Sequence, residues 1–255
     1  MFHDTVFGPI HSRRLGTSLG LNLLPNDGKV CTFDCLYCEA GFNAQGTGAT
    51  GLPKREDVAT QLEARLKQML ADGEPLDVIT FSGNGEPTMH PEFAGIVEDT
   101  ARLRDKYYPE ARLSVLTNST RIFTPEIAEA LKRVDNNILK LDSAVEGTMR
   151  VIDRPTSENF TVERVVKSLR QFSGTGIVQT MMVRGQWNGK EFDNTTDEEI
   201  EALIETYRRI SPREIMIYSL DRPTPAKTLQ KIPAERLQAI GKRIAEATGI
   251  PVKVN

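Results

Sequence analysis

The hydrophobic positions of this chain follow two periodicities, one typical of strands and one typical of helices, which alternate along most of its length. Short apolar or alternating runs predict buried strands, and apolar residues three or four positions apart predict amphipathic helices. The predicted strands are 19–23, 78–81, 113–117, 138–142, 177–183, 214–220 and 252–254. The predicted helices are 56–70, 91–107, 125–134, 162–172, 198–210 and 234–247.

Residues near the predicted helix ends agree with these boundaries. Thr124 precedes the third helix, and Thr195 and Thr196 precede the fifth, where a hydroxyl can cap the first turn. Gly249 follows the last helix, and glycine commonly ends helices in a left-handed conformation. Strands and helices in regular succession imply a parallel sheet with helices outside it. Six such units in about 230 residues predict an α/β fold, a partial (β/α)6 barrel.

The chain carries no linker-like or low-complexity segment, so we expect residues 1–255 to form one domain. Residues 1–18 are expected to form an N-terminal arm that carries Arg13 and Arg14. Because this arm precedes the first predicted strand, we expect the two arginines to be structural. Residues 25–53 form a loop region that contains all the cysteines.

The inner face of the predicted barrel is polar. If the large apolar side chains point outward to the helices, small and polar residues remain on the inside: Gly20, Asn22, Thr80, Ser82, Ser114, Asn118, Lys140, Asp142 and Gln179. Buried polar groups without partners cost about 1–3 kcal/mol each. A wet or ligand-filled interior is therefore favoured over a dry one, and hydrogen bonding within a filled core is the alternative.

Composition narrows the class of partner. The 28.4 kDa chain has 26% charged and 39% hydrophobic residues, a formal net charge of −3, and lysines and arginines scattered along its length. Proteins that hold nucleic acid present a basic surface, so this balance disfavours a tRNA substrate. No apolar stretch approaches the roughly 18 residues of a membrane helix. With no signal peptide at Met1 and clustered cysteines, we expect a cytoplasmic protein.

The three cysteines of the chain, Cys31, Cys35 and Cys38, lie at C-x3-C-x2-C spacing. Three thiols cannot all pair as disulfides, and a four-cysteine zinc or ferredoxin site would need a further thiolate. One loop with this spacing can wrap a single metal centre from three sides. A [4Fe-4S] cluster held by three cysteines keeps one iron open for a ligand, which is a catalytic arrangement.

With Tyr37 in its aromatic position, this motif resembles the signature of the radical S-adenosylmethionine (radical SAM) superfamily. The wider match covers 8–16, 38–39 and 81–87, and it resembles the branch related to wyosine-tRNA synthetases. The resemblance implies the same partial barrel. It also implies that Cys31, Cys35 and Cys38 hold a [4Fe-4S] cluster whose open iron binds SAM. A flavodoxin- or ferredoxin-type donor would then supply an electron that cleaves SAM to a 5′-deoxyadenosyl radical.

The resemblance also implies which residues contact SAM. They are Tyr37 of the motif, the turn Gly83, Asn84, Gly85 and Glu86 after the second strand, Asn118, Asp142, Ser143 and Leu220 at later strand ends. The turn would offer carbonyls to the methionine ammonium, although relatives often have a plain Gly-Gly-Glu here. Ordinary turn, capping and salt-bridge roles remain the alternatives.

Further strand-end residues are candidates for the substrate. Lys140 is expected to neutralise Asp142 or to bind a substrate anion. Arg154 and Arg184 could hold a carboxylate or remain solvated at the rim. His90 follows the Glu86 turn, with a surface position as the default. Trp187 could be a lid residue or pack within its loop.

The favoured hypothesis is a radical SAM enzyme, a lyase or oxidoreductase, that acts on a small molecule such as a nucleobase or deazapurine, as queuine lyases do. With no cysteines for an auxiliary cluster, wyosine formation is disfavoured. A tRNA-modifying or glycyl-radical-activating enzyme is the second hypothesis. The third is a three-cysteine zinc or redox-sensor protein without SAM chemistry.

Overall fold

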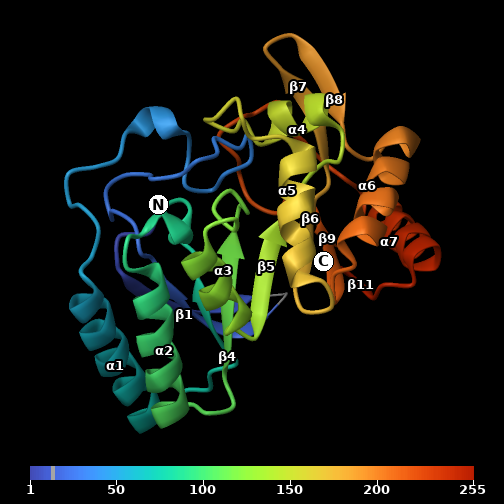
Figure 1. Ribbon diagram of the computed structural model, residues 1–255. Coiled ribbons are helices and arrows are strands. Elements are labelled where there is room, and N and C mark those ends of the chain that lie inside the picture. Colours follow the sequence, from blue (N-terminus) through green and yellow to red (C-terminus); the bar gives the residue numbers. More distant parts are fainter. Residues whose placement is uncertain (13–14) are drawn as a thin grey trace. The chain divides into compact units, whose positions relative to one another are not determined.

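The computed structural model describes residues 1–12 and 15–255, so the expectation for Arg13 and Arg14 lies outside the described residues (Figure 1). The chain divides into two compact units. Unit 1 contains Met1–Cys31, Asn43–Thr117 and Arg121–Asn137, and unit 2 contains Thr32–Phe42, Asn118–Thr120 and Ile138–Asn255.

Unit 1 is a sheet covered by helices. Its strands follow the order β1 (Val6–Ser12), β2 (Gly16–Leu21), β3 (Val78–Phe81), β4 (Arg112–Thr117). The pairs β2–β3 and β3–β4 are parallel, as the sequence predicted. The helices α1 (Arg55–Ala71), α2 (Phe93–Tyr107) and α3 (Pro125–Lys132) lie side by side (Figure 1), with short 3-10 turns η1 (Asn43–Gln45) and η2 (Pro87–Met89).

The N-terminal segment, expected as an arm over residues 1–18, contains the strand β1. β1 pairs antiparallel with β2, with an irregular register between Phe7 and Ile10. Phe7 lies opposite Gly20, and a Cβ on Gly20 would come within 2.1 Å of the Phe7 ring. The ring of Phe2 stacks on Phe7 with 3.9 Å between centroids. Gly20 therefore accommodates an aromatic side chain, which the polar inner row predicted for it did not anticipate.

Unit 2 continues the parallel pattern. β5 (Asn136–Lys140), β6 (Ile177–Met181), β9 (Glu214–Tyr218) and β11 (Val252–Val254) are adjacent in that order and run parallel. The helices are α4 (Glu146–Ile152), α5 (Val162–Leu169) with η3 (Arg170–Phe172), α6 (Asp197–Ile210) and α7 (Ala234–Thr248). The sequence reasoning did not predict α4.

A second, antiparallel sheet in unit 2 was also missed. It has the order β10 (Gln230–Lys231), β7 (Val183–Trp187), β8 (Lys190–Asp193). The strand predicted at 177–183 therefore ends at Met181, and Val183 already belongs to β7. Asn188 and Gly189 both have positive φ at the β7–β8 turn, as tight hairpins require.

The predicted helix ends hold at two of three sites. The Thr196 side chain accepts a hydrogen bond from the Glu199 N–H and caps α6, and Gly249 ends α7 with a φ of 70°. Thr124 stands at the N-cap of α3, but its side chain accepts no capping hydrogen bond from the described residues. None of the described helices has the length and apolarity of a membrane span.

Candidate functional site

The cysteine loop carries Cys31, Cys35 and Cys38, all partly exposed. Cys31 ends the first segment of unit 1, and Cys35 and Cys38 lie in unit 2. The Cys38 N–H donates to the Cys35 carbonyl over 3.2 Å, and the Gly41 N–H donates to the Cys38 carbonyl over 2.9 Å. The donor set and its spacing fit a three-thiolate cluster. In the part of the chain that the structure describes, no three His, Cys, Asp or Glu side chains already converge as metal ligands, so the assignment rests on donor type and spacing.

Within unit 2, the loop is held by the segment that follows α4. The Leu36 N–H donates to the Ile152 carbonyl over 3.0 Å, and the Thr156 N–H donates to the Thr32 carbonyl over 2.9 Å. Between these bonds, Phe33 and Pro155 form an antiparallel bridge. The cysteine motif is therefore paired like a short strand with the segment from Ile152 to Thr156.

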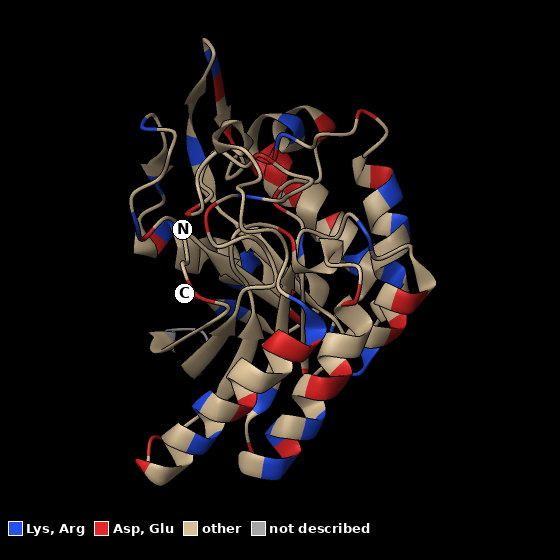
Figure 2. Ribbon diagram, turned by 90° about the vertical axis from the view of Figure 1, so that its left-hand side faces the viewer, with Lys and Arg blue, Asp and Glu red and all other residues tan. Residues whose placement is uncertain are grey.

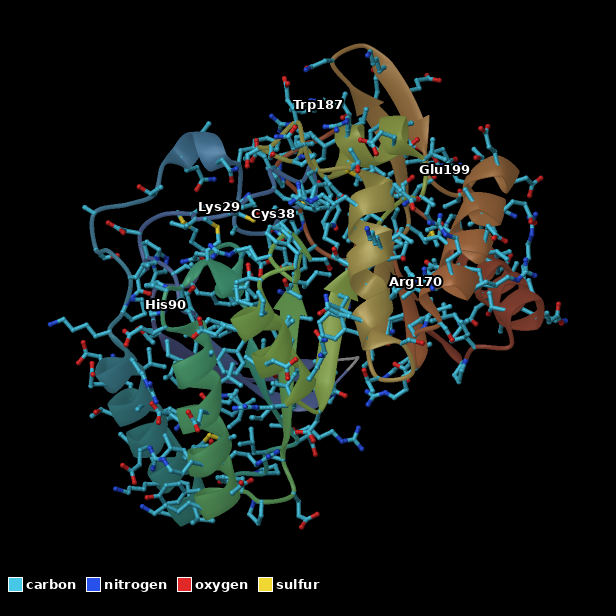
Figure 3. All side chains as sticks on the ribbon, in the orientation of Figure 1. Lys29, Cys38, His90, Arg170, Trp187 and Glu199 are labelled. Atoms are coloured by element: carbon cyan, nitrogen blue, oxygen red, sulfur yellow. The ribbon has the colours of Figure 1, made fainter. Side chains whose placement is uncertain are left out.

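Arg154 lies in the middle of this pairing. Its guanidinium is 3.0 Å from the Asp34 carboxylate, and it also lies over the rings of Phe42 and Trp187, at 5.1 and 5.0 Å from their centroids. Trp187, on β7, packs within unit 2 rather than standing free as a lid (Figure 3). Of the two alternatives given for Arg154, a carboxylate partner or a solvated rim position, the structure shows a side chain that is 31% exposed and paired with the carboxylate of Asp34.

A buried ionic network surrounds the end of β5. Lys140 contacts the Asp142 carboxylate and the Tyr37 hydroxyl, and its Nζ is 3.0 Å from Asp153. The Tyr37 hydroxyl also donates to Asp142, whose other oxygen accepts from the Met181 N–H over 2.9 Å. The expected neutralisation of Asp142 by Lys140 is thus present, with Asp153 and Tyr37 as further members.

The network contains two carboxyl groups, those of Asp142 and Asp153, and one lysine, Lys140. Burial opposes the charged form of Lys140, but Asp142 and Asp153 outweigh it and hold the pKa of Lys140 well above its usual value. Burial also raises the pKa of Asp153 well above its usual range, because a single lysine offsets two carboxylates only in part. Burial, reinforced by Asp142, raises the pKa of Tyr37. Tyr37 is therefore a hydrogen-bonding phenol in this network.

The backbone beside Asp142 is fixed by residues that the sequence reasoning missed. The Asn194 carboxamide donates to the carbonyls of Asp142 and Met181, over 2.7 Å each. The Ser143 hydroxyl donates to Glu199 over 2.6 Å, at the start of α6 (Figure 3). Burial raises the pKa of Glu199. Neither Asn194 nor Glu199 belongs to a recognisable sequence motif, so no sequence signal indicated their role.

Asn118 is engaged locally in the way its capping alternative described. Its side-chain oxygen accepts from the Thr120 N–H over 3.0 Å and from the Thr120 hydroxyl over 2.7 Å. Its amide nitrogen donates to the Thr32 hydroxyl over 2.9 Å. These contacts tie the residue after β4 to Thr32, the residue that follows Cys31.

The turn from Gly83 to Glu86 belongs to unit 1 and is built around Asn84. The buried Asn84 side chain donates to the carbonyls of Phe2 and Pro25, over 2.7 and 2.9 Å, and accepts from the Phe2 N–H. Its backbone carbonyl accepts from the Val30 N–H over 3.0 Å. Asn84 therefore fixes the turn against the residue that precedes Cys31.

Glu86 and His90 are buried, structural members of the same region. The Glu86 carboxylate accepts from the Thr88 N–H and hydroxyl and from the Thr117 hydroxyl, which joins η2 to β4. One ring nitrogen of His90 lies 2.8 Å from the Pro53 carbonyl, and the other accepts from the Glu92 N–H. The expected surface position of His90 is wrong, because its ring is enclosed and both nitrogens are used (Figure 3).

Gly85 is required for this turn by its conformation and its surroundings. Its φ is +137°, and a Cβ would lie 1.9 Å from the Val30 carbonyl oxygen. We expect Gly85→Ala to lower the free energy of unfolding by about 2–4 kcal/mol through left-handed strain and overlap. Gly147→Ala on α4 meets nothing within 4 Å and should cause no loss. Urea denaturation of both variants tests this, and equal stability of the two would contradict it.

Leu220 and Arg184 lie in different surroundings, one packed and one exposed. Leu220 packs against the apolar cluster of Leu36, Met181 and Val183. Arg184, on β7, is exposed and its Nε donates to the Gln230 side chain over 3.1 Å. Arg184 therefore lies on the central strand of the antiparallel sheet, with its side chain exposed.

Part of the predicted polar inner row satisfies itself by hydrogen bonding within unit 1. The hydroxyls of Ser18 and Thr80 lie 2.9 Å apart, and the Asn136 amide donates to the Ser114 hydroxyl over 2.9 Å. The Asn22 side chain bonds to Leu24, Asn26 and Asn84. In this unit, the alternative of mutual hydrogen bonding accounts for these residues.

The region that contains the cysteine motif matches known proteins. Residues 26–198 match the family model described as the Radical SAM superfamily. A UPF0026 protein of Synechocystis is 28% identical over 97% of this chain and 95% of its own length. A UPF0026 protein of Methanocaldococcus jannaschii is 29% identical over 88% of this chain and 66% of its own. A protein named GTPase Obg, from Brachyspira hyodysenteriae, is 25% identical over 98% of this chain, which spans 35% of that protein.

Solved structures agree on the fold. A radical SAM methyltransferase from Sphaerobacter thermophilus has a TM-score of 0.68 at 19% identity, over 93% of this chain and 65% of that one. Archaeal TYW1 has a TM-score of 0.58 at 13% identity, over 92% of this chain and 74% of that one. These likenesses confirm the predicted fold class, an α/β partial (β/α)6 barrel of the radical SAM type, and the resemblance on which it partly rested.

Proposed function

The chain belongs to the radical SAM superfamily, and from that premise we propose that it is an enzyme in which Cys31, Cys35 and Cys38 hold the cluster. Members of this superfamily use a [4Fe-4S] cluster and SAM. When bound, the two supply a 5′-deoxyadenosyl radical that removes a hydrogen atom from a substrate, with the electron coming from a flavodoxin- or ferredoxin-type donor. The observation that carries the proposal is the set of three cysteines at C-x3-C-x2-C spacing on one loop within the matched region.

The protein's own residues position and shield the reacting groups. The Gly83–Glu86 turn is proposed to present carbonyls to the SAM ammonium, supported by the close packing of Gly85 against Val30. The polar atoms of Asn118, Asp142 and Ser143 already have partners in unit 2. Their proposed part is therefore to hold the strand ends in place, and any contact with SAM would be additional to these bonds.

We propose a small-molecule substrate, such as a nucleobase or deazapurine. Basic and acidic residues are interspersed along the helices (Figure 2), and several arginines are paired with acids. Arg209 pairs with Glu163, and Arg243 pairs with Asp197 and Glu201. Paired arginines and a net charge of −3 provide little attraction for a phosphate backbone. Three clustered cysteines outside any disulfide support a reducing compartment, and we propose the cytoplasm.

Anaerobic reconstitution tests the proposal. We expect a brown protein with about four iron and four sulfide per chain that releases 5′-deoxyadenosine from SAM when reduced. A colourless protein that binds zinc instead would contradict it. The substrate class is tested separately by tRNA binding over a salt series. Binding that persists at 200 mM salt would indicate that the substrate is tRNA and not a small molecule.

A further inference from the structure

Arg154 has an unusual backbone conformation for an arginine. Its φ is +47°, in the left-handed region that side chains other than glycine rarely adopt. The Asp34 N–H lies 3.1 Å from the carbonyls of both Asp153 and Arg154. Strained residues persist where the surrounding structure holds them, and here the strain places Arg154 against the cysteine loop.

The Arg154 side chain reaches both sides of the Cys35–Cys38 segment. Asp34 immediately precedes Cys35, and its carboxylate and carbonyl lie 3.0 and 3.4 Å from the guanidinium nitrogens. Phe42 follows Cys38 by four residues, and its ring lies under the same guanidinium at 5.1 Å. All these residues belong to unit 2. One planar cation thus joins the entry and the exit of the segment that carries two of the three thiols.

Trp187 on β7 is the second aromatic residue in contact with the Arg154 guanidinium. Its ring centroid lies 5.0 Å from the guanidinium carbon and 5.6 Å from the Phe42 ring centroid. Arg154 is thereby enclosed by two aromatic rings and one carboxylate, an arrangement that suits a flat guanidinium and not a lysine ammonium. The cysteine loop is linked through it to the antiparallel sheet.

We propose that Arg154 is a positioning residue that keeps the Cys35–Cys38 segment in the shape that retains the cluster. The proposal rests on the proposed function in one respect, the role of the thiols as cluster ligands. In this proposal, the Arg154 guanidinium binds the protein's own cysteine loop and not a carboxylate of SAM or substrate.

The test compares Arg154→Ala and Arg154→Lys with Arg209→Ala, which removes an exposed Arg–Glu pair from the same unit. In the reconstituted enzyme, we expect Arg154→Ala to lose iron to a chelator about tenfold faster than wild type, since it loses two cation–π contacts and an ion pair. Arg154→Lys should be intermediate, because it keeps the charge but not the stacking. Arg209→Ala should match wild type.

Amide hydrogen exchange in the cluster-free protein gives a second readout. Exchange should accelerate in residues 32–42 of Arg154→Ala, while the rest of the chain and the melting temperature stay close to those of Arg209→Ala. Wild-type iron retention and wild-type exchange in Arg154→Ala would overturn the inference, as would exchange that accelerates equally throughout the chain. Failure of the wild type to take up iron would instead overturn the proposed function, and the exchange measurement would still decide the role of Arg154.

Discussion

Cys35→Ser is expected to abolish cluster retention and the release of 5′-deoxyadenosine from SAM. A hydroxyl replaces one of three thiolate ligands, and the loss should exceed the roughly 10–100-fold reduction that changes outside the ligand shell cause. Because Cys35 is partly exposed, the fold should be retained. Iron and sulfide content and product formation after anaerobic reconstitution measure the effect.

Glu39→Gln provides the matched control for Cys35→Ser. Glu39 follows Cys38 directly, and its pair with Arg222 is more than half exposed on both sides. This variant changes the charge of the same loop without touching a thiol, so it should retain iron like the wild type. A Cys35→Ser protein with wild-type iron content and SAM cleavage would refute the assignment of the ligands.

Lys140→Met is expected to lower the free energy of unfolding by about 3–5 kcal/mol, because it leaves the buried Asp142 without its cationic partner. The matched control is Lys132→Met, which removes an exposed pair with Glu129 and should cost at most about 1 kcal/mol. Urea denaturation gives both values.

A second variant separates charge pairing from substrate binding. Lys140→Met/Asp153→Asn removes one carboxylate together with the lysine, and it should recover part of the lost stability if Lys140 is a charge partner. If Lys140 binds substrate instead, the single variant Lys140→Ala would fold normally, cleave SAM and fail to turn over substrate. A stable Lys140→Met protein would contradict the charge-pairing role.

Elements with strong periodicity were predictable from the sequence. α6 combines buried apolar positions with a Thr196 cap, and α7 ends at Gly249 with the left-handed conformation that glycine allows. β1 was missed because Gly8 and Pro9 interrupt its alternation where the register with β2 is irregular. β10 spans two residues, Gln230 and Lys231, which is too short for any periodicity.

Site residues could be predicted where they are close together in the sequence, at the end of a predicted strand. The position of Lys140 beside Asp142 could be predicted because both fall at the end of one predicted strand, 138–142, although β5 itself ends at Lys140. Their further partners, Tyr37 and Asp153, come from distant segments that only the fold brings near. His90 shows the same limit, since the carbonyl of Pro53 and the N–H of Glu92 that enclose its ring leave no mark in the sequence.

The most direct test of the central claim is the electron paramagnetic resonance spectrum of the reduced, reconstituted protein before and after addition of SAM. If three thiolates leave one iron open, SAM binds that iron and the g-values of the [4Fe-4S]⁺ signal shift. A cluster signal that SAM leaves unchanged, or a protein that holds a fully coordinated metal without such a signal, would contradict the account.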